Sequence, residues 1–287
     1  MHLGEIGVWS SALRTADPAV AADAAAELEA LGFGAAWIPG RSPADLEERV
    51  RGLLEATQTL VVATGIVSIW GIPAPELAAV RHRIEADFPG RFLLGIGVSH
   101  APLAEQYRAP LTAMRAYLDE LDAAGTPPDA RVIAALAPRM LETARDRACG
   151  AHPYLVTPAH TSWARGILGA GPLLAPEQTV ALEADPVSAR ALARLRLEVY
   201  LQLPNYVSTW TGRLGFDEVD VEHGGSDRLV DALVAWGTDA EVARRVREHL
   251  AAGADHVPVQ VVTADPSVPA VAEWRRLALA LELPAPA

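Results

Sequence analysis

Small, hydroxylated or basic residues stand directly after five consecutive hydrophobic stretches of this sequence. These residue types can let a flat ligand approach the backbone, bind an anion or move a proton. Polar residues at the ends of ordinary strands would produce part of the same pattern, so the pattern points to a shared site without fixing its chemistry. The five groups are Pro39-Gly40-Arg41, Val67-Ser68, Ser99-His100, Ala137-Pro138-Arg139 and Thr157-Pro158.

His100 is the member of this set best suited to acid–base chemistry, because an imidazole titrates near neutral pH and can donate or accept a proton. Arg139 follows Pro138 at the start of a predicted helix, where unpaired amides and the helix dipole favour an anion. Its guanidinium would add a charge-assisted hydrogen bond. A solvated helix start explains Arg139 equally well, and a plain surface position explains Arg41 equally well.

Gly95-Ile96-Gly97 follows a strand and invites comparison with a dinucleotide-binding fingerprint. The third glycine of that fingerprint is absent, since His100 occupies its position, and the motif lies on the fourth predicted strand rather than the first. Two readings stay open for the glycines. They allow either a sharp turn off the strand end or the close approach of a flat ligand.

Other catalytic signatures are missing from the sequence. It has no phosphate-binding Gly-x-x-x-x-Gly-Lys loop, no Gly-x-Ser-x-Gly elbow and no pair of histidines at metal-ligand spacing. Its single cysteine, Cys149, excludes an intramolecular disulfide and a thiolate metal cluster. We therefore expect no metal site.

The composition excludes several classes of partner. A formal net charge of −12 argues against nucleic acid, which binds basic surfaces. No uncharged apolar run of membrane-spanning length occurs, and no basic-then-apolar leader opens the sequence. We expect a cytoplasmic protein with a small-molecule substrate. With 51% hydrophobic residues the chain can also build a sizeable core.

The elements that must position these residues alternate between strand-like and helix-like segments along the whole chain. Eight strands with helical crossovers in 287 residues predict a (β/α)8 TIM barrel, in which the residues after the strands meet at one rim. We expect one domain, residues 1–287, with a largely helical insertion over Pro186–Trp236 between the seventh and eighth strands. The predicted strands are Leu3–Trp9, Phe33–Ile38, Leu60–Ile66, Arg91–Val98, Arg131–Leu136, His152–Val156, Gln178–Glu183 and His256–Val262.

Several of these segments also carry a family likeness. Gly90–Gly97 resembles the GRF-x-LG-x-G signature of luciferase-like flavin and deazaflavin oxidoreductases, and Leu31–Trp37 and Ala252–Val257 are similar to two further junctions of that superfamily. Ala135–Leu141 and Leu203–Tyr206 resemble actinobacterial members assigned to coenzyme F420. The likeness extends over almost the whole chain.

The resemblance implies a tricyclic cofactor ring across the barrel mouth. It places Gly65-Ile66, as a non-prolyl cis peptide or a bulge, behind the ring, although Gly65 would also serve close packing. The resemblance implies that His100 is the catalytic residue, which donates or accepts a proton of the substrate. The other implied cofactor-binding residues are Ser68 near the ring, Gly97, Val98 and Ser99 at its edge, Ala137, Pro138 and Arg139 around the tail phosphate, and Thr157 at the rim.

One departure limits the likeness. Sugar-phosphate dehydrogenases of the family carry an acid and a histidine after the second strand, where this sequence has Gly40 and Arg41. The resemblance therefore implies an F420-dependent oxidoreductase with an unidentified small organic substrate. Because members of the family are commonly homodimers, it also implies a homodimer. The alternatives are an FMN-dependent monooxygenase and a non-catalytic flavin-binding homologue.

Overall fold

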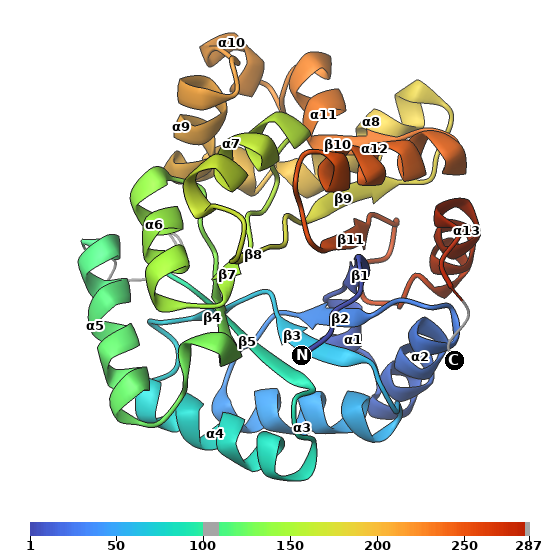
Figure 1. The fold of residues 1–287 in the computed structure, drawn as a ribbon. Helices are drawn as coiled ribbons and strands as arrows, with labels where there is room; N and C mark the ends of the chain where they lie inside the picture. Colours follow the sequence, from blue (N-terminus) through green and yellow to red (C-terminus); the bar gives the residue numbers. More distant parts are fainter. Residues whose placement is uncertain (100–108, 285–287) are drawn as a thin grey trace.

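The strands form a parallel barrel with the helices around its outside (Figure 1). The computed structural model describes residues 1–99 and 109–284. The strand pairs of this part of the chain are all parallel. The strands are β1 (Ile6–Trp9), β2 (Ala35–Ile38), β3 (Val61–Thr64), β4 (Val67–Ser68), β5 (Phe92–Gly97), β6 (Arg131–Ile133), β7 (Gly150–Ala151), β8 (Leu173–Leu174), β9 (Gln178–Ala181), β10 (Val234–Trp236) and β11 (Val257–Val261).

Helices connect neighbouring parallel strands, as parallel pairing requires, except that β3 leads directly into β4 and β8 directly into β9. None of the helices in the described ranges combines the length and the hydropathy needed to cross a bilayer. The helices are α1 (Ala12–Thr15), α2 (Pro18–Ala30), α3 (Pro43–Glu55), α4 (Ala74–Asp87), α5 (Pro110–Ala123), α6 (Pro138–Arg147), α7 (Pro158–Leu168), α8 (Pro186–Leu197), α9 (Pro204–Arg213), α10 (Glu218–Val221), α11 (Asp227–Leu233), α12 (Asp239–Ala251) and α13 (Val271–Leu281), with short 3-10 turns η2 (Pro128–Ala130) and η3 (Tyr200–Gln202).

The barrel closes where β8 continues into β9. On one side of this stretch the amides of Ala175 and Glu177 donate to the carbonyls of Ala151 and Pro153, next to β7. On the other side the amide of Asp255, just before β11, donates to the carbonyl of Leu174. Since β11 pairs with β1, the hydrogen-bonded ring is complete.

Side-chain alternation separates an inner core from an outer core. In β2, Ala35 and Trp37 belong to a cluster inside the barrel, whereas Ala36 and Ile38 belong to the larger cluster under the helices. Successive residues of a strand point to opposite faces, so every strand is buried on both sides. This explains the nearly continuous apolar runs in the sequence.

Capping residues stabilise the starts of several helices. The side chain of Asp17 accepts a hydrogen bond from the amide of Ala19 at 2.9 Å, and Thr238 and Glu241 form a capping box at the start of α12. Such caps satisfy amides that the first turn leaves without a partner.

Two predicted strands need correction, and one short strand was not predicted. The predicted strand Leu60–Ile66 divides into β3 and β4 around Gly65-Ile66. The sixth strand is Gly150–Ala151 rather than His152–Val156, because Pro153 offers no amide for a ladder and Leu155 has a positive φ of 52°. The short strand β8, which leads into β9, was not predicted.

The insertion over Pro186–Trp236 is helical except at its end. Its last residues form β10, which pairs with β9, so the largely helical insertion ends in a short strand that was not predicted. β10 pairs with the edge of β9 that does not face β11, and this edge would otherwise be open to pairing with another chain. The insertion packs around its own apolar cluster, which includes Leu197, Trp210 and Leu233.

Candidate active site

A cavity of about 450 Å³ opens among residues that follow the carboxyl ends of β1, β3, β5, β6 and β7. This is the end at which barrel enzymes keep their sites, and the volume lies in the usual range for small-molecule pockets. The insertion covers it from one side through η3 and α9. Its lining residues are Trp9, Gly65, Ile66, Gly97, Val98, Ser99, Pro110, Ala134, Ala135, Leu136, Ala137, Met140, His152, Tyr154, Tyr200, Asn205, Tyr206, Ser208, Thr209 and Arg213.

Backbone forms one wall of the cavity. The peptide bond between Gly65 and Ile66 is cis, which confirms the prediction made for this junction. Trp9 Nε1 donates a hydrogen bond to the Gly65 carbonyl at 2.9 Å, and the Ile66 carbonyl accepts one from the amide of Gly40 at 3.2 Å. A Cβ on Gly65 would lie 2.3 Å from Trp9 Nε1, so only glycine fits there.

The end of β5 forms an adjoining edge. Gly97, Val98 and Ser99 all line the cavity. Ser99 has a positive φ of 54°, a conformation that non-glycine residues rarely adopt and that often occurs at functional positions. Trp70 Nε1 donates to the Val98 carbonyl at 2.6 Å and fixes the course of the chain here.

The first turn of α6 reaches the cavity through Ala137 and Met140. Pro138 occupies the first helical turn, and the Arg139 side chain is exposed. The helix has ten residues, so its amino end offers amides and a partial positive charge at the rim. An anionic group of a bound molecule is favoured at this point.

His152 lies at the cavity with one ring nitrogen unpaired. Its Nδ1 is 2.7 Å from the Ala175 carbonyl, which can only accept, so Nδ1 carries the proton. Nε2 is buried and has no hydrogen-bond partner in the described chain. Burial lowers the pKa of His152 to about 4, so the ring is neutral at physiological pH.

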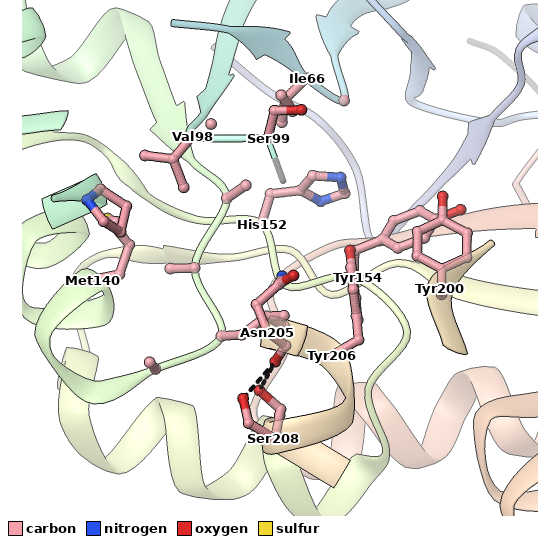
Figure 2. Close-up of a pocket in the computed structure, with 18 of the residues that line it drawn as sticks. Ile66, Val98, Ser99, Met140, His152, Tyr154, Tyr200, Asn205, Tyr206 and Ser208 are labelled. Atoms are coloured by element: carbon pink, nitrogen blue, oxygen red, sulfur yellow. Dashed lines mark hydrogen bonds between the residues drawn. The ribbon is translucent and has the colours of Figure 1, made fainter. Parts of the chain in front are cut away.

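Tyrosines make up the side of the cavity opposite Val98 and Met140 (Figure 2). Tyr154 and Tyr200 have ring centroids 5.4 Å apart. The Tyr154 hydroxyl donates to Gln260 Oε1 at 2.5 Å. Behind the rings, Arg196 Nη2 donates to the hydroxyls of Tyr154 and Tyr200. The cavity thus has an apolar side and a polar aromatic side.

Glu177 is a fully buried carboxyl close to this tyrosine side. Its two oxygens accept hydrogen bonds from the Thr179 hydroxyl at 2.5 Å and the Leu155 amide at 3.3 Å. Burial raises the pKa of Glu177 to about 7 against the opposing effect of these hydrogen bonds and of Arg196. The group is therefore only partly ionised near neutral pH.

Six of the residues predicted for the cofactor site lie together at this cavity. They are Gly65, Ile66, Gly97, Val98, Ser99 and Ala137. Pro138 and Arg139 belong to the helix start beside it, although neither lines it.

Other predicted residues lie away from the cavity lining or outside the described chain. The Ser68 hydroxyl accepts from the amide of Trp70 at 3.3 Å, and that of Thr157 caps α7 by accepting from the His160 amide at 3.4 Å. Arg41 is exposed and does not line the cavity. His100 lies outside the described residues. No group of three or more His, Cys, Asp or Glu in the described ranges is placed to hold a metal ion.

Sequence reasoning missed most of the aromatic side of the cavity. Trp9 is the last residue of the first predicted strand. The rule that site residues of a barrel lie at the carboxyl ends of its strands therefore also applies to Trp9. His152 was taken as the beginning of a strand, and it follows one instead, because the strand lies two residues earlier. Tyr200 comes from the insertion, where no strand end marks it.

Comparisons with known proteins agree on the fold. No protein-family model matches the sequence, and no curated protein matches it. An F420-dependent secondary alcohol dehydrogenase, solved with an F420–acetone adduct, matches with a TM-score of 0.73 at 13% identity over 98% of this chain and 99% of that one. An F420-dependent tetrahydromethanopterin reductase from Methanopyrus kandleri gives 0.72 at 17% identity over 96% and 97%.

A third structure is a flavoprotein. The oxygenating constituent of 3,6-diketocamphane monooxygenase from Pseudomonas putida, in complex with FMN, gives a TM-score of 0.69 at 15% identity over 99% of this chain and 98% of that one. This chain shares their fold. The α/β barrel predicted from the sequence is thus the architecture of the molecule, and the matches extend over nearly the whole of both chains.

Proposed function

We propose that this chain is an oxidoreductase of the luciferase-like superfamily that exchanges a hydride between coenzyme F420 and a small organic substrate. One observation carries the proposal. One wall of the 450 Å³ cavity is backbone, formed by Gly65 and Ile66 at the carboxyl end of β3. A flat ring system can lie against such a wall because no Cβ projects from Gly65.

The residues around the cavity fit a deazaflavin. Gly65-Ile66 would support the face of the ring, Gly97 and Ser99 would border its edge, and Val98 and Met140 would cover its apolar part. The amino end of α6, at Ala137, would receive the phosphate-bearing tail. When bound, this cofactor supplies or accepts a hydride.

The chain itself would orient the substrate, limit the access of water and handle one proton. We assign the proton to His100, whose place in the sequence directly follows Ser99 at the cavity edge. His152 is poorly suited to that role, because its pKa of about 4 keeps it neutral and its Nε2 is buried.

FMN is the second candidate cofactor, because the FMN-bound monooxygenase from Pseudomonas putida has the same fold. We favour F420 because Ala135–Leu141 and Leu203–Tyr206 resemble members assigned to it. Residues of both segments line the cavity, among them Ala137, Met140 and Tyr206.

Purification from a host that makes both cofactors tests the proposal. We expect the protein to retain F420, identified by its mass and by its absorbance after release. Recovery of FMN at one equivalent per chain would favour the monooxygenase. In that case the protein should also accelerate oxygen consumption by reduced FMN.

A further inference from the structure

Arg196 is a guanidinium that lies among aromatic rings without a carboxylate partner. Its Cζ lies 5.8 Å from the ring centroid of Trp9, 5.6 Å from that of Tyr154 and 5.1 Å from that of Tyr200. No ion pair joins it to an acidic residue of the described chain. A charge withdrawn from water is normally paired, because an unpaired one is costly.

The other arginines of α8 make the contrast clear. Arg190 pairs with Asp231 at 2.6 Å and with Asp227 at 2.9 Å, and Arg194 pairs with Asp227 at 2.5 Å. Arg190 also stacks on an aromatic ring, that of Trp236, at 5.3 Å. Arg190 therefore combines ring stacking with ion pairs, whereas Arg196 has the ring stacking alone.

The nitrogens of Arg196 are unequally used. Nη2 donates to the Tyr154 and Tyr200 hydroxyls and to Gln260 Oε1. Nε is buried without a partner, and Nη1 makes no hydrogen bond to a described residue. The nearby carboxyl of Glu177 is a poor counter-ion, because burial raises its pKa to about 7.

Arg196 also borders a second, smaller cavity of about 70 Å³. Trp9 lines both this cavity and the larger one, so the two cavities adjoin at this residue. Three hydroxyl-bearing residues, Ser10, Ser11 and Thr263, are among the residues that line the smaller cavity, and no described aspartate or glutamate is. A cation with hydroxyl groups and no competing carboxylate is the chemistry that binds a small anion.

We propose that Arg196 is an anion-binding residue and that the smaller cavity receives a carboxylate. A planar carboxylate matches a guanidinium with unused donors, and the cavity has room for such a group but not for a cofactor ring. The missing counter-ion of Arg196 is then supplied by the ligand. Assigning this carboxylate to the substrate rests on the proposed function, whereas the binding site itself does not.

Calorimetric titration of the purified protein with propionate, without F420, tests this site. Propionate should bind at one site per chain, and propionamide, its neutral counterpart, should bind about tenfold more weakly or worse. Arg196→Met should weaken propionate binding by a similar factor, whereas Arg190→Met, on the same helix, should leave it unchanged. Equal binding of propionate and propionamide, or wild-type affinity in Arg196→Met, would overturn the proposal.

A second variant and a second ligand complete the test. If Arg196→Met does not fold, Arg196→Lys keeps the charge but loses the planar donors, and it should also bind propionate more weakly than the wild type. Wild-type affinity in that variant would count against the site. Tighter binding of inorganic phosphate than of propionate would refute the carboxylate assignment. Loss of F420 binding with propionate binding intact would refute the proposed function alone.

Discussion

The indole N–H of Trp9 donates a hydrogen bond to the carbonyl oxygen of Gly65 across 2.9 Å. This contact joins the end of β1 to the cis peptide that follows β3, two places 56 residues apart in the sequence. It holds the backbone wall of the cavity from inside the barrel. The same indole borders the smaller cavity beside Arg196, so Trp9 is common to both proposed sites.

Replacing Gly65 by alanine should destabilise the protein. The added Cβ would lie 2.3 Å from Trp9 Nε1 and 3.2 Å from His152 Nε2, and each of these rings is held by a hydrogen bond to a backbone carbonyl. Overpacking of this kind costs about 1–3 kcal/mol. Urea unfolding of Gly65→Ala measures the loss. A free energy of unfolding equal to that of the wild type would show that the Trp9 and His152 rings yield freely.

Gly52→Ala is the matched control for this substitution. Gly52 lies inside α3, and a Cβ there would meet nothing within 4 Å. Alanine is favoured over glycine in a helix by up to about 1 kcal/mol, so this variant should be more stable than the wild type. A lower free energy of unfolding in Gly65→Ala together with a higher one in Gly52→Ala would show that crowding of the added Cβ destabilises the Gly65 variant.

The barrel could be predicted from the sequence because its strands are buried on both faces and read as apolar runs such as Leu60–Ile66. The backbone side of the cavity, with Gly65, Gly97 and Ala137, was implied by the resemblance to a known family rather than by these runs. The aromatic side could not be predicted. Arg196 and Tyr200 reach the barrel only through the packing of the insertion, and no local pattern records which helix face turns inward.

Stability should depend on the ionisation of Glu177. Its pKa is raised to about 7 in the folded chain from 4.5, so the folded state binds its proton more tightly than the unfolded state does. The stabilisation is complete below pH 4.5 and is lost as the pH rises to about 7, by about 3 kcal/mol at most. Glu177→Gln keeps an acceptor for the Thr179 hydroxyl but cannot ionise, so it should unfold at higher urea concentration than the wild type at pH 8.

At pH 5 the advantage of Glu177→Gln should shrink, because the wild-type carboxyl is then mostly protonated. Unfolding curves at the two pH values give the comparison. An advantage of the same size at both would mean that Glu177 does not titrate in this range.

Buried histidines should act in the opposite direction. Burial lowers the pKa of His152 and His256 to about 4 and that of His249 to about 3, from 6.5. Below pH 6.5 these histidines bind protons in the unfolded chain but stay neutral in the folded chain. The free energy of unfolding therefore falls as the pH drops toward 4. Each histidine contributes about 3 kcal/mol or more to the total loss.

The three histidines together outweigh the gain from Glu177, so we expect net destabilisation between pH 6.5 and 4. Urea midpoints measured across this range check the sign. Midpoints that rise steadily toward pH 4 would contradict the neutral, buried state of these rings.

Replacing His100 by alanine should reduce turnover about 10²–10⁴-fold, the usual contribution of general acid–base catalysis. Affinity for the cofactor should change little, because the imidazole is assigned to the substrate proton rather than to the ring. Exposed His2 provides the control, since His2→Ala should leave both quantities unchanged. Equal turnover in His100→Ala and wild type would remove His100 from the mechanism.

Fluorescence titration of the purified protein with F420, and separately with FMN, tests the central claim most directly. The account predicts saturable binding of one F420 per chain, in the micromolar range or tighter (a free energy of about −8 kcal/mol or more negative), with weaker binding of FMN. Absence of F420 binding, or tighter binding of FMN than of F420, would contradict the account.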